Sequence, residues 1–221
     1  EETFNEYAYF SSFSSSWTEH ASRYVHEVSE RLGLGPGSFV VEVASNDGYL
    51  LDHVVGRGIR CLGIEPSINV GDAARRRGVP TLTEFLTADS GARIRAEYGP
   101  ADLVVANNVY AHIPDIVGFT RGLVELVSPT GLVSIEVQHL LTLVELTQFD
   151  TIYHEHFQYY TVASAQRALA TAGLSLVDVE LLSTHGGSIR LWARPENAAN
   201  GPSERVFEVL AAEAAAGVHG P

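Results

Sequence analysis

Residues 40–51 read Val-Val-Glu-Val-Ala-Ser-Asn-Asp-Gly-Tyr-Leu-Leu, and this stretch decides the fold. The apolar run that starts at Phe39 and ends at Val43 is rich in β-branched residues and predicts a strand buried on both faces. A small polar turn follows, and Gly48 ahead of Tyr49 favours a helix start where the backbone approaches a ligand closely. Strand, turn and helix in this order predict a ligand site at the carboxyl end of the first strand of an open α/β sheet.

A second signal follows the turn. Cys61-Leu62-Gly63-Ile64 is another short apolar run, and it ends at Glu65. An acid about twenty residues after such a turn has the position of a ribose-binding carboxylate. The turn holds a single glycine, so it does not match the G-x-G-x-x-G pattern of nicotinamide enzymes. Packing of the strand against the helix would also explain the small residues of the turn. The turn taken alone does not distinguish this alternative from a ligand site.

The turn together with Glu65 resembles the class I S-adenosylmethionine (SAM) methyltransferases. In that class the first strand carries an acid, the turn is small and contains glycine, and an acid after the second strand binds the ribose hydroxyls. The resemblance implies SAM as the cofactor. It implies cofactor contacts at Glu42, Ala44, Ser45, Asn46, Asp47, Gly48, Glu65, Pro66, Asn107 and Asn108.

Composition narrows the class of protein. With 221 residues, 45% of them hydrophobic, the chain can bury one sizeable core. The net charge of −13 argues against nucleic acid as a partner. No apolar run is long enough to span a membrane and no signal peptide opens the sequence, so we expect a cytoplasmic protein without a membrane partner. The lone Cys61 permits neither an intramolecular disulfide nor a multi-cysteine zinc site.

Apolar runs alternate with amphipathic segments along the rest of the chain, which is typical of an α/β fold with right-handed crossovers. The Gly186-Gly187 turn predicts a hairpin between the last two strands. We therefore expect a doubly wound seven-stranded sheet with an antiparallel last strand. The predicted strands are 39–43, 61–64, 78–82, 102–106, 132–137, 174–182 and 188–193, and the helices after the first turn are 67–77, 88–98, 116–127, 164–172 and 204–216.

The N-terminal segment is rich in aromatic residues. Phe10, Phe13 and Trp17 have helical spacing, and the stripe continues to Val28. This pattern predicts a helix that packs its aromatic face on the sheet. Tyr7 lies before the helix, in a segment able to fold across a ligand, where its phenol could donate a hydrogen bond to a substrate.

The chain divides near its C-terminal end. We expect residues 1–195 to form the methyltransferase domain, including the aromatic helix. Residues 196–221 are expected to form a linker and an Ala-rich helix that buries little on its own and leads to a further C-terminal domain. The sequence has no methionine, even at its first position, which indicates part of a longer polypeptide.

Residues 149–160 concentrate tyrosines, histidines and an acid, and three hypotheses compete for them. His154 and His156, with His112 from another loop, could form a three-histidine metal site. A second explanation is a structural cluster satisfied by hydrogen bonds. The third is general base catalysis, in which a neutral imidazole accepts a proton bound to carbon next to a carbonyl.

Four motifs together resemble the nucleotide-sugar C-methyltransferases, bacterial enzymes that methylate a ring carbon of deoxysugars destined for antibiotics. The motifs are S-N-D-G, Y-x-Y-F-S-S, N-N-V-x-A-H-I-P-D and D-T-I-Y-H-E-H-F-x-Y-Y. The resemblance implies a nucleotide-linked ketosugar as substrate and His156 as the base. It also implies a sugar pocket lined by Tyr7, His112, Tyr153 and Glu155.

The resemblance also implies partners that this sequence lacks. Members of that family usually carry an N-terminal cysteine-bound zinc module and a C-terminal α/β domain, and neither is present in these 221 residues. The base mechanism needs an unligated imidazole, so no catalytic metal is expected. An O-methyltransferase acting on a small molecule and a catalytically silent SAM-binding domain are the alternative functions.

Overall fold

The computed structural model describes residues 10–198 and 201–218. Within them, seven strands form one sheet in the order β3-β2-β1-β4-β5-β7-β6. The strands are β1 (Phe39–Val43), β2 (Arg60–Ile64), β3 (Thr81–Leu82), β4 (Ala101–Asn107), β5 (Val127–Gln138), β6 (Leu174–Leu182) and β7 (Ser188–Pro195). The helices are α1 (Ser15–Leu32), α2 (Leu51–Val55), α3 (Ile68–Arg76), α4 (Ala88–Tyr98), α5 (Ile116–Leu126), α6 (Leu140–Glu145), α7 (Val162–Thr171) and α8 (Glu204–Ala215). The doubly wound seven-stranded α/β sheet is confirmed.

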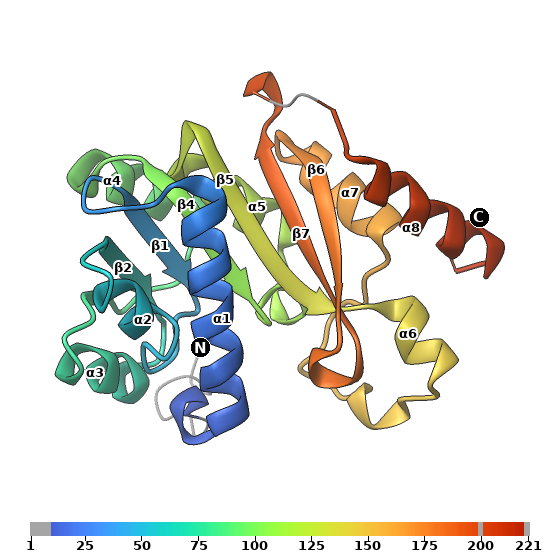
Figure 1. Ribbon diagram of the computed structural model, residues 1–221, viewed down its shortest axis with the longest axis horizontal. Coiled ribbons are helices and arrows are strands. Elements are labelled where there is room, and N and C mark those ends of the chain that lie inside the picture. The colour runs from blue at the N-terminus through green and yellow to red at the C-terminus, as the bar shows by residue number, and fades with distance from the viewer. Residues whose placement is uncertain (1–9, 199–200, 219–221) are drawn as a thin grey trace.

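Helices cover both faces of the sheet (Figure 1), and the alternation of side chains along each strand explains why. In β1, Val40 packs in the cluster formed with α1, α2 and α3. Its neighbours Phe39, Val41 and Val43 pack in the cluster on the other face, with α4, α5 and α7. All five residues of β1 are buried, as expected for a central strand with helices on both sides.

The sheet is parallel except at one end. β1 pairs in parallel with β2 and β4, and β4 pairs in parallel with β5. β7 is antiparallel to both β5 and β6. The predicted antiparallel finish is therefore confirmed, and β7 lies between its two neighbours rather than at the edge.

The start of α1 differs from the sequence-based prediction. The helix begins at Ser15, because the Ser14 side chain accepts a hydrogen bond from the backbone N–H of Trp17 and caps it there. Phe10 and Phe13 lie before the helix and stack on each other, and Phe13 is 83% exposed. The buried part of the stripe starts further along the helix and includes Val28.

Two other helix starts also differ in detail. The helix predicted over 164–172 begins earlier, at Val162, because the Thr161 side chain caps it; Ser164 completes the capping box by accepting a hydrogen bond from the backbone N–H of Thr161. Ser67 is the residue before α3, but its side chain makes no capping hydrogen bond. The backbone N–H of Ser67 instead donates to the carboxylate of Glu65.

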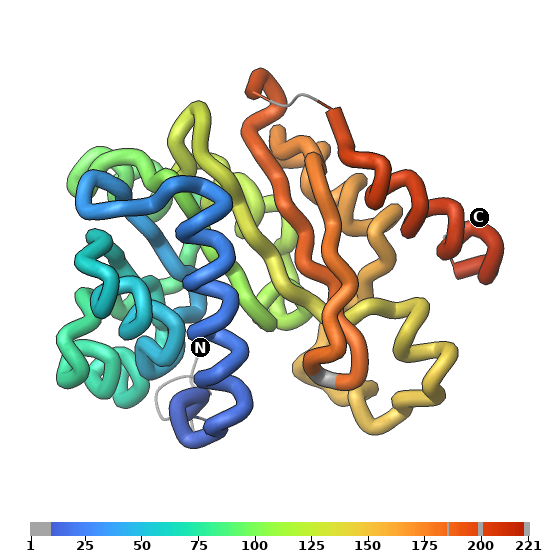
Figure 2. Tube along the Cα trace, in the orientation of Figure 1, coloured from blue at the N-terminus to red at the C-terminus, as the bar shows by residue number. Residues whose placement is uncertain are grey.

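The C-terminal helix is docked on the domain. Val206 and Glu213 of α8 are fully buried, and α8 packs against α7 and β6. Figure 2 shows the same arrangement, with the red end of the chain lying along the orange α7. The helix thus buries more than its Ala-rich sequence suggests, while the expected further domain stays a prediction. Among the residues that the structure describes, no helix is long and apolar enough to cross a membrane.

Gly63 in β2 sets how closely the first turn approaches the second strand. A Cβ atom at this position would lie 2.4 Å from Ser45 Oγ and 3.0 Å from Thr81 Oγ1. Overpacking of this kind costs about 1–3 kcal/mol. We expect Gly63→Ala to lower the free energy of unfolding by about that amount in urea titrations. Gly37→Ala is the control, because no atom lies within 4 Å of a Cβ placed there; equal stability of the two variants would contradict the prediction.

Candidate active site

The carboxyl ends of β1, β2, β4 and β5 meet at one edge of the sheet, because these strands are parallel neighbours. This edge faces the lower side of Figure 1, where the start of α1 and the segment after β5 also lie. Val43 is level with Ile64, and Asn107 is level with Glu136. The residues that follow these positions therefore gather along the edge, where open α/β sheets bind their ligands.

The turn between β1 and α2 has an unusual backbone. Ala44, Asn46 and Gly48 all have positive φ values, of 55°, 50° and 78°. Left-handed conformations are uncommon for residues other than glycine and cluster at functional sites. A side chain at position 48 would also lie 3.0 Å from Val79 Cγ2, so this position requires glycine for both reasons. Asn108, in the loop after β4, has a φ of 53° as well.

The carboxylate of Glu65 joins the two turns at this edge. One oxygen accepts the backbone N–H of Asn46 at 3.0 Å, and the other accepts that of Ser67 at 2.8 Å. Burial raises the pKa of Glu65, and these hydrogen bonds oppose the rise. Each carboxylate oxygen has a second lone pair, so Glu65 retains acceptor capacity for ligand hydroxyls.

Glu42 lies beside Glu65 and is 1% exposed. Its pKa is raised well above the usual value by burial, and further by the neighbouring charges of Glu65 and Asp47. The Oε2 atom of Glu42 has no hydrogen-bond partner among the described residues, and the same holds for Ser45 Oγ, Asn107 Oδ1 and Asn108 Nδ2. Buried polar atoms are normally hydrogen-bonded, so this edge carries donors and acceptors suited to a polar ligand.

Asn46 and Asp47 hold the N-terminal segment over the turn. Asn46 Oδ1 accepts the backbone N–H of Ser11 at 2.9 Å, and Asp47 Oδ1 accepts that of Ser12 at 3.3 Å. The family resemblance assigns both residues to the cofactor and does not predict this contact. The paired serines in the Y-x-Y-F-S-S motif were the available signal. Tyr7, which precedes them, lies outside the described residues.

His112 and His156 come together although 44 positions separate them in the sequence. Their rings lie 4.8 Å apart, nearly edge to face. The loop after β4 and the segment after β5 are joined here, because the N–H of Phe157 donates to the carbonyl of Ala111 at 2.9 Å. The pKa of His112 is lowered by burial and by the nearby His156, while Glu155 opposes the shift through its charge and a backbone hydrogen bond.

Hydrogen bonds define the tautomer of His156. Its Nδ1 lies 2.9 Å from the carbonyl oxygen of Thr151, which can only accept, so Nδ1 carries the proton of the neutral ring. Nε2 is then the acceptor, and the hydroxyl of Tyr153 donates to it at 2.8 Å. Burial, followed by the charge of Glu155, raises the pKa of Tyr153. Tyr153 and His156 thus form one hydrogen-bonded pair.

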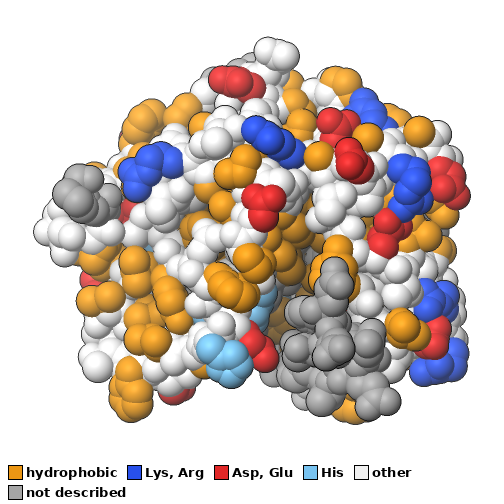
Figure 3. All heavy atoms as spheres, turned by 180° about the vertical axis from the view of Figure 1, so that it is seen from behind, with side chains coloured by type: hydrophobic (Ala, Val, Ile, Leu, Met, Phe, Trp, Pro, Cys, Tyr) orange, Lys and Arg blue, Asp and Glu red, His pale blue; other side chains and the backbone are white. Residues whose placement is uncertain are grey.

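Several side chains of the segment 153–155 are exposed to solvent. His154 and Glu155 are exposed, and Tyr153 is 43% exposed. Exposed apolar side chains follow the same segment, and Figure 3 shows histidine and acidic side chains next to hydrophobic ones low on the rear face. Among the described residues, no group of three or more His, Cys, Asp or Glu is arranged to hold a metal ion. His154 therefore does not join His112 and His156 in the hypothetical three-histidine site.

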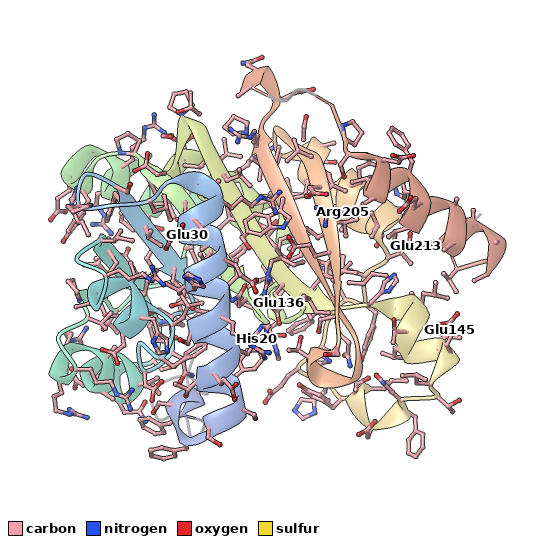
Figure 4. The ribbon with its side chains drawn as sticks, viewed as in Figure 1. His20, Glu30, Glu136, Glu145, Arg205 and Glu213 are labelled. Carbon is pink, nitrogen blue, oxygen red and sulfur yellow. The ribbon has the colours of Figure 1, made fainter. Side chains whose placement is uncertain are left out.

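A buried ion-pair network at the end of β5 was not predicted from the sequence. Glu136 accepts hydrogen bonds from His20, at 3.0 Å, and from Arg190, at 2.7 Å. Figure 4 labels Glu136 and His20, which lie close together between β5 and α1. Burial alone would raise the pKa of Glu136, but these two partners outweigh it and lower the pKa. Trp17 stacks on His20 and also on Tyr49 of the turn. The available signal was Glu136 itself, an acid within the predicted apolar strand 132–137, because a buried charge requires partners.

Comparison with known proteins identifies the family of this chain. The family model described as "Methyltransferase domain" matches residues 17–179. The chain belongs to the methyltransferase family. It is also 38% identical to the C-methyltransferase NovU of Streptomyces niveus over 215 residues, which are 97% of this chain and 51% of NovU. The resemblance to C-methyltransferases is thereby confirmed, and the chain spans about half the length of this curated relative.

Solved structures of other methyltransferases share the fold. The magnesium protoporphyrin IX methyltransferase ChlM of Synechocystis PCC 6803, solved with bound S-adenosylhomocysteine (SAH), aligns with a TM-score of 0.60 over 80% of this chain and 82% of its own, at 17% identity. A SAM-dependent methyltransferase of Anabaena variabilis aligns with a TM-score of 0.62 over 81% of this chain and 86% of its own, at 14% identity. These structures support the class I methyltransferase fold.

The contact between the two histidines predicts a shift in titration. The nearby His156 lowers the pKa of His112, because two positive charges repel each other. His156→Asn should therefore raise the pKa of His112, which proton NMR of the ring signals can follow. His154→Asn is the matched control, because His154 is exposed and, within the described residues, its ring does not contact that of His112. A pKa of His112 that is unchanged or lower in His156→Asn would contradict the proximity of the two rings.

Proposed function

We propose that this methyltransferase uses SAM to methylate a ring carbon next to the ketone of a nucleotide-linked keto-deoxysugar. The observation that carries the proposal is the hydrogen-bonded pair of Tyr153 and His156 beside His112, at the edge where the strands end. It supports carbon methylation because a C–H bond next to a ketone needs a base before the carbon can act as a nucleophile. The 38% identity to a C-methyltransferase supports the same reaction class.

The residues at the carboxyl ends of β1, β2 and β4 fit SAM. Glu65 retains lone pairs for ribose hydroxyls, and the left-handed backbone at Ala44, Asn46 and Gly48 is of the kind that clusters at functional sites. The unpartnered polar atoms of Asn107 and Asn108 are suited to its polar groups. When bound, SAM supplies the electrophilic methyl group.

The protein side of the reaction is proton removal. The hydroxyl of Tyr153 donates to Nε2 of His156, so the phenol oxygen is the outer atom of the pair. In the proposed step, the substrate proton moves to the Tyr153 oxygen while the phenol proton moves to His156 Nε2, and the electrons of the C–H bond form the enolate. The lowered pKa of His112 keeps that ring neutral near pH 7, so it can donate a hydrogen bond without adding a second positive charge.

This arrangement requires an unligated imidazole, so the proposal includes no catalytic metal. His156 Nδ1 is fixed by the Thr151 carbonyl and Nε2 by Tyr153, which leaves both ring nitrogens engaged within the protein. The Thr151 contact also orients the ring, in the way that a carboxylate or carbonyl orients many catalytic histidines.

Glu65 tests the cofactor site. Glu65→Ala removes the acceptor proposed for the ribose hydroxyls, and a hydrogen bond to a charged group is worth about 1.5–3 kcal/mol. We expect SAH affinity, measured by calorimetry, to fall at least several-fold. Glu97→Ala should leave it unchanged, because Glu97 is an exposed acid on α4. Equal SAH affinity in Glu65→Ala and the wild type would place the cofactor elsewhere.

His156 tests the base. Asparagine is close in shape to histidine but is not basic, and positioned proton transfer typically contributes about 10²–10⁴-fold to the rate. His156→Asn should lower methyl transfer to a 4-keto-sugar nucleotide by about that factor while SAH affinity stays nearly intact. It should also abolish exchange of the ring proton in deuterated water without SAM.

The exposed neighbour provides the control for this test. His154→Asn should retain most of the activity, because His154 lies on the outside of the segment. Wild-type turnover is established first with the same substrate. Turnover near the wild-type level in His156→Asn would show that the base is another residue, with His112 the next candidate.

A further inference from the structure

The proposed catalytic pair lies in a long excursion between β5 and α7. This excursion comprises residues 139–161, and it leaves the sheet at the end of β5 and returns to it before α7 (Figure 2). Its two ends are held together, since His139 and Tyr160 form an isolated parallel bridge. The N–H of Leu140 donates to the carbonyl of Tyr160 at 2.8 Å. The excursion is therefore a closed loop with a narrow base.

A single carboxylate from α8 spans that base. Glu213 Oε1 lies 2.9 Å from His139 Nε2, at the start of the excursion. The same oxygen accepts the N–H of Val162 at 2.5 Å, and Oε2 accepts that of Ala163 at 3.1 Å, just past the end of the excursion. These two amides are in the first turn of α7, where backbone N–H groups have no partner within the helix. Glu213 thus caps α7, just after the excursion ends, and also binds His139, where the excursion starts.

The contact is strong because it is buried and fully hydrogen-bonded. Glu213 is 0% exposed, and His139 is 3% exposed. Burial alone would raise the pKa of Glu213, but the hydrogen bonds from His139, Val162 and Ala163 outweigh burial and lower the pKa. His139 is held on its other ring nitrogen as well, since Nδ1 lies 3.2 Å from Thr142 Oγ1.

The helix that carries Glu213 is itself fixed at its other end. Asp178 of β6 pairs with Arg205, near the start of α8, and accepts the hydroxyl of Ser203 at 2.6 Å. The N–H of Ser203 donates to the carbonyl of Val177 at 2.8 Å. Val206 and Glu213 are seven residues apart, so these two buried side chains are on the same face of the helix. α8 therefore presents Glu213 in a fixed position.

We propose that Glu213 is a positioning residue, which holds the base of the 139–161 excursion so that Tyr153 and His156 stay aligned beside His112. The catalytic part of this inference rests on the proposed function, and the structural part does not. The excursion has a second attachment, because Phe157 and Gln158 bond the backbone of the loop after β4. Loss of Glu213 therefore misaligns the pair without releasing the whole segment.

The test compares Glu213→Ala with Glu208→Ala in the full chain, because Glu208 is an exposed acid on the same helix. In Glu213→Ala, amide hydrogen exchange across residues 139–163 should accelerate at least about ten-fold, since the lost partners leave buried groups unsatisfied. Methyl transfer should show a kcat lowered by about ten- to a hundred-fold, the size expected of misplacement. The KM for SAM and the affinity for SAH should stay unchanged, because the turn at residues 44–48 is not part of the contact. Glu208→Ala should match the wild type in every measurement.

The two readouts separate this inference from the proposed function. If the wild type transfers no methyl group to any keto-sugar, hydrogen exchange still decides whether Glu213 holds the excursion. If Glu213→Ala does not fold, the isosteric Glu213→Gln is compared in the same way, and it should give a smaller shift in the same direction. Unchanged exchange across residues 139–163 would overturn the proposal. A parallel fall of kcat, SAH affinity and melting temperature would overturn it as well, because that pattern describes a general loss of folded protein.

Discussion

The hydrogen bonds of Glu65 to the backbone of Asn46 and Ser67 are the interaction on which the candidate site depends. They join the turn after β1 to the turn after β2, and they fix the first turn in a conformation that ordinary residues rarely adopt. Side chains from this same turn then accept the backbone N–H groups of Ser11 and Ser12. Glu65 thus connects the end of the second strand to the first turn, and that turn is itself connected to the N-terminal segment.

Two further acids repeat this arrangement along the same edge. Glu136 joins α1 to the end of β5 and the start of β7 through His20 and Arg190. Glu213 joins α8 to both ends of the excursion after β5. Burying a charge is costly unless it is paired and hydrogen-bonded, and in each case several donors meet one carboxylate. The apolar clusters hold the helices on the sheet, whereas these carboxylates determine where the loops at its edge lie.

The sequence predicted the fold well because the signals for the fold are local. Each buried strand is a short apolar run, and the turn at Gly48 and the acid at Glu65 are recognisable from their spacing. The meeting of His112 and His156 was predicted through the metal-site hypothesis and through the family motifs, since no periodicity relates two loops 44 positions apart. Helix starts were less certain, because Ser and Thr both cap helices and the choice at α7 depends on which of two neighbouring hydroxyls faces the end of the helix.

The roles of Glu136 and Glu213 were beyond the reach of the sequence for a different reason. Glu213 lies in an Ala-rich segment with several acids, and nothing local separates it from its exposed neighbour Glu208. Its burial follows from the docking of α8, and the docking follows from the position of Asp178 on a strand that precedes the helix by more than twenty residues. A charged residue acquires such a role only when the fold brings donors to it from several elements. The polar contacts that hold the excursion are therefore the part of this protein that its sequence predicts least well. The residues that they position, Tyr153 and His156, are by contrast recognisable from a sequence motif.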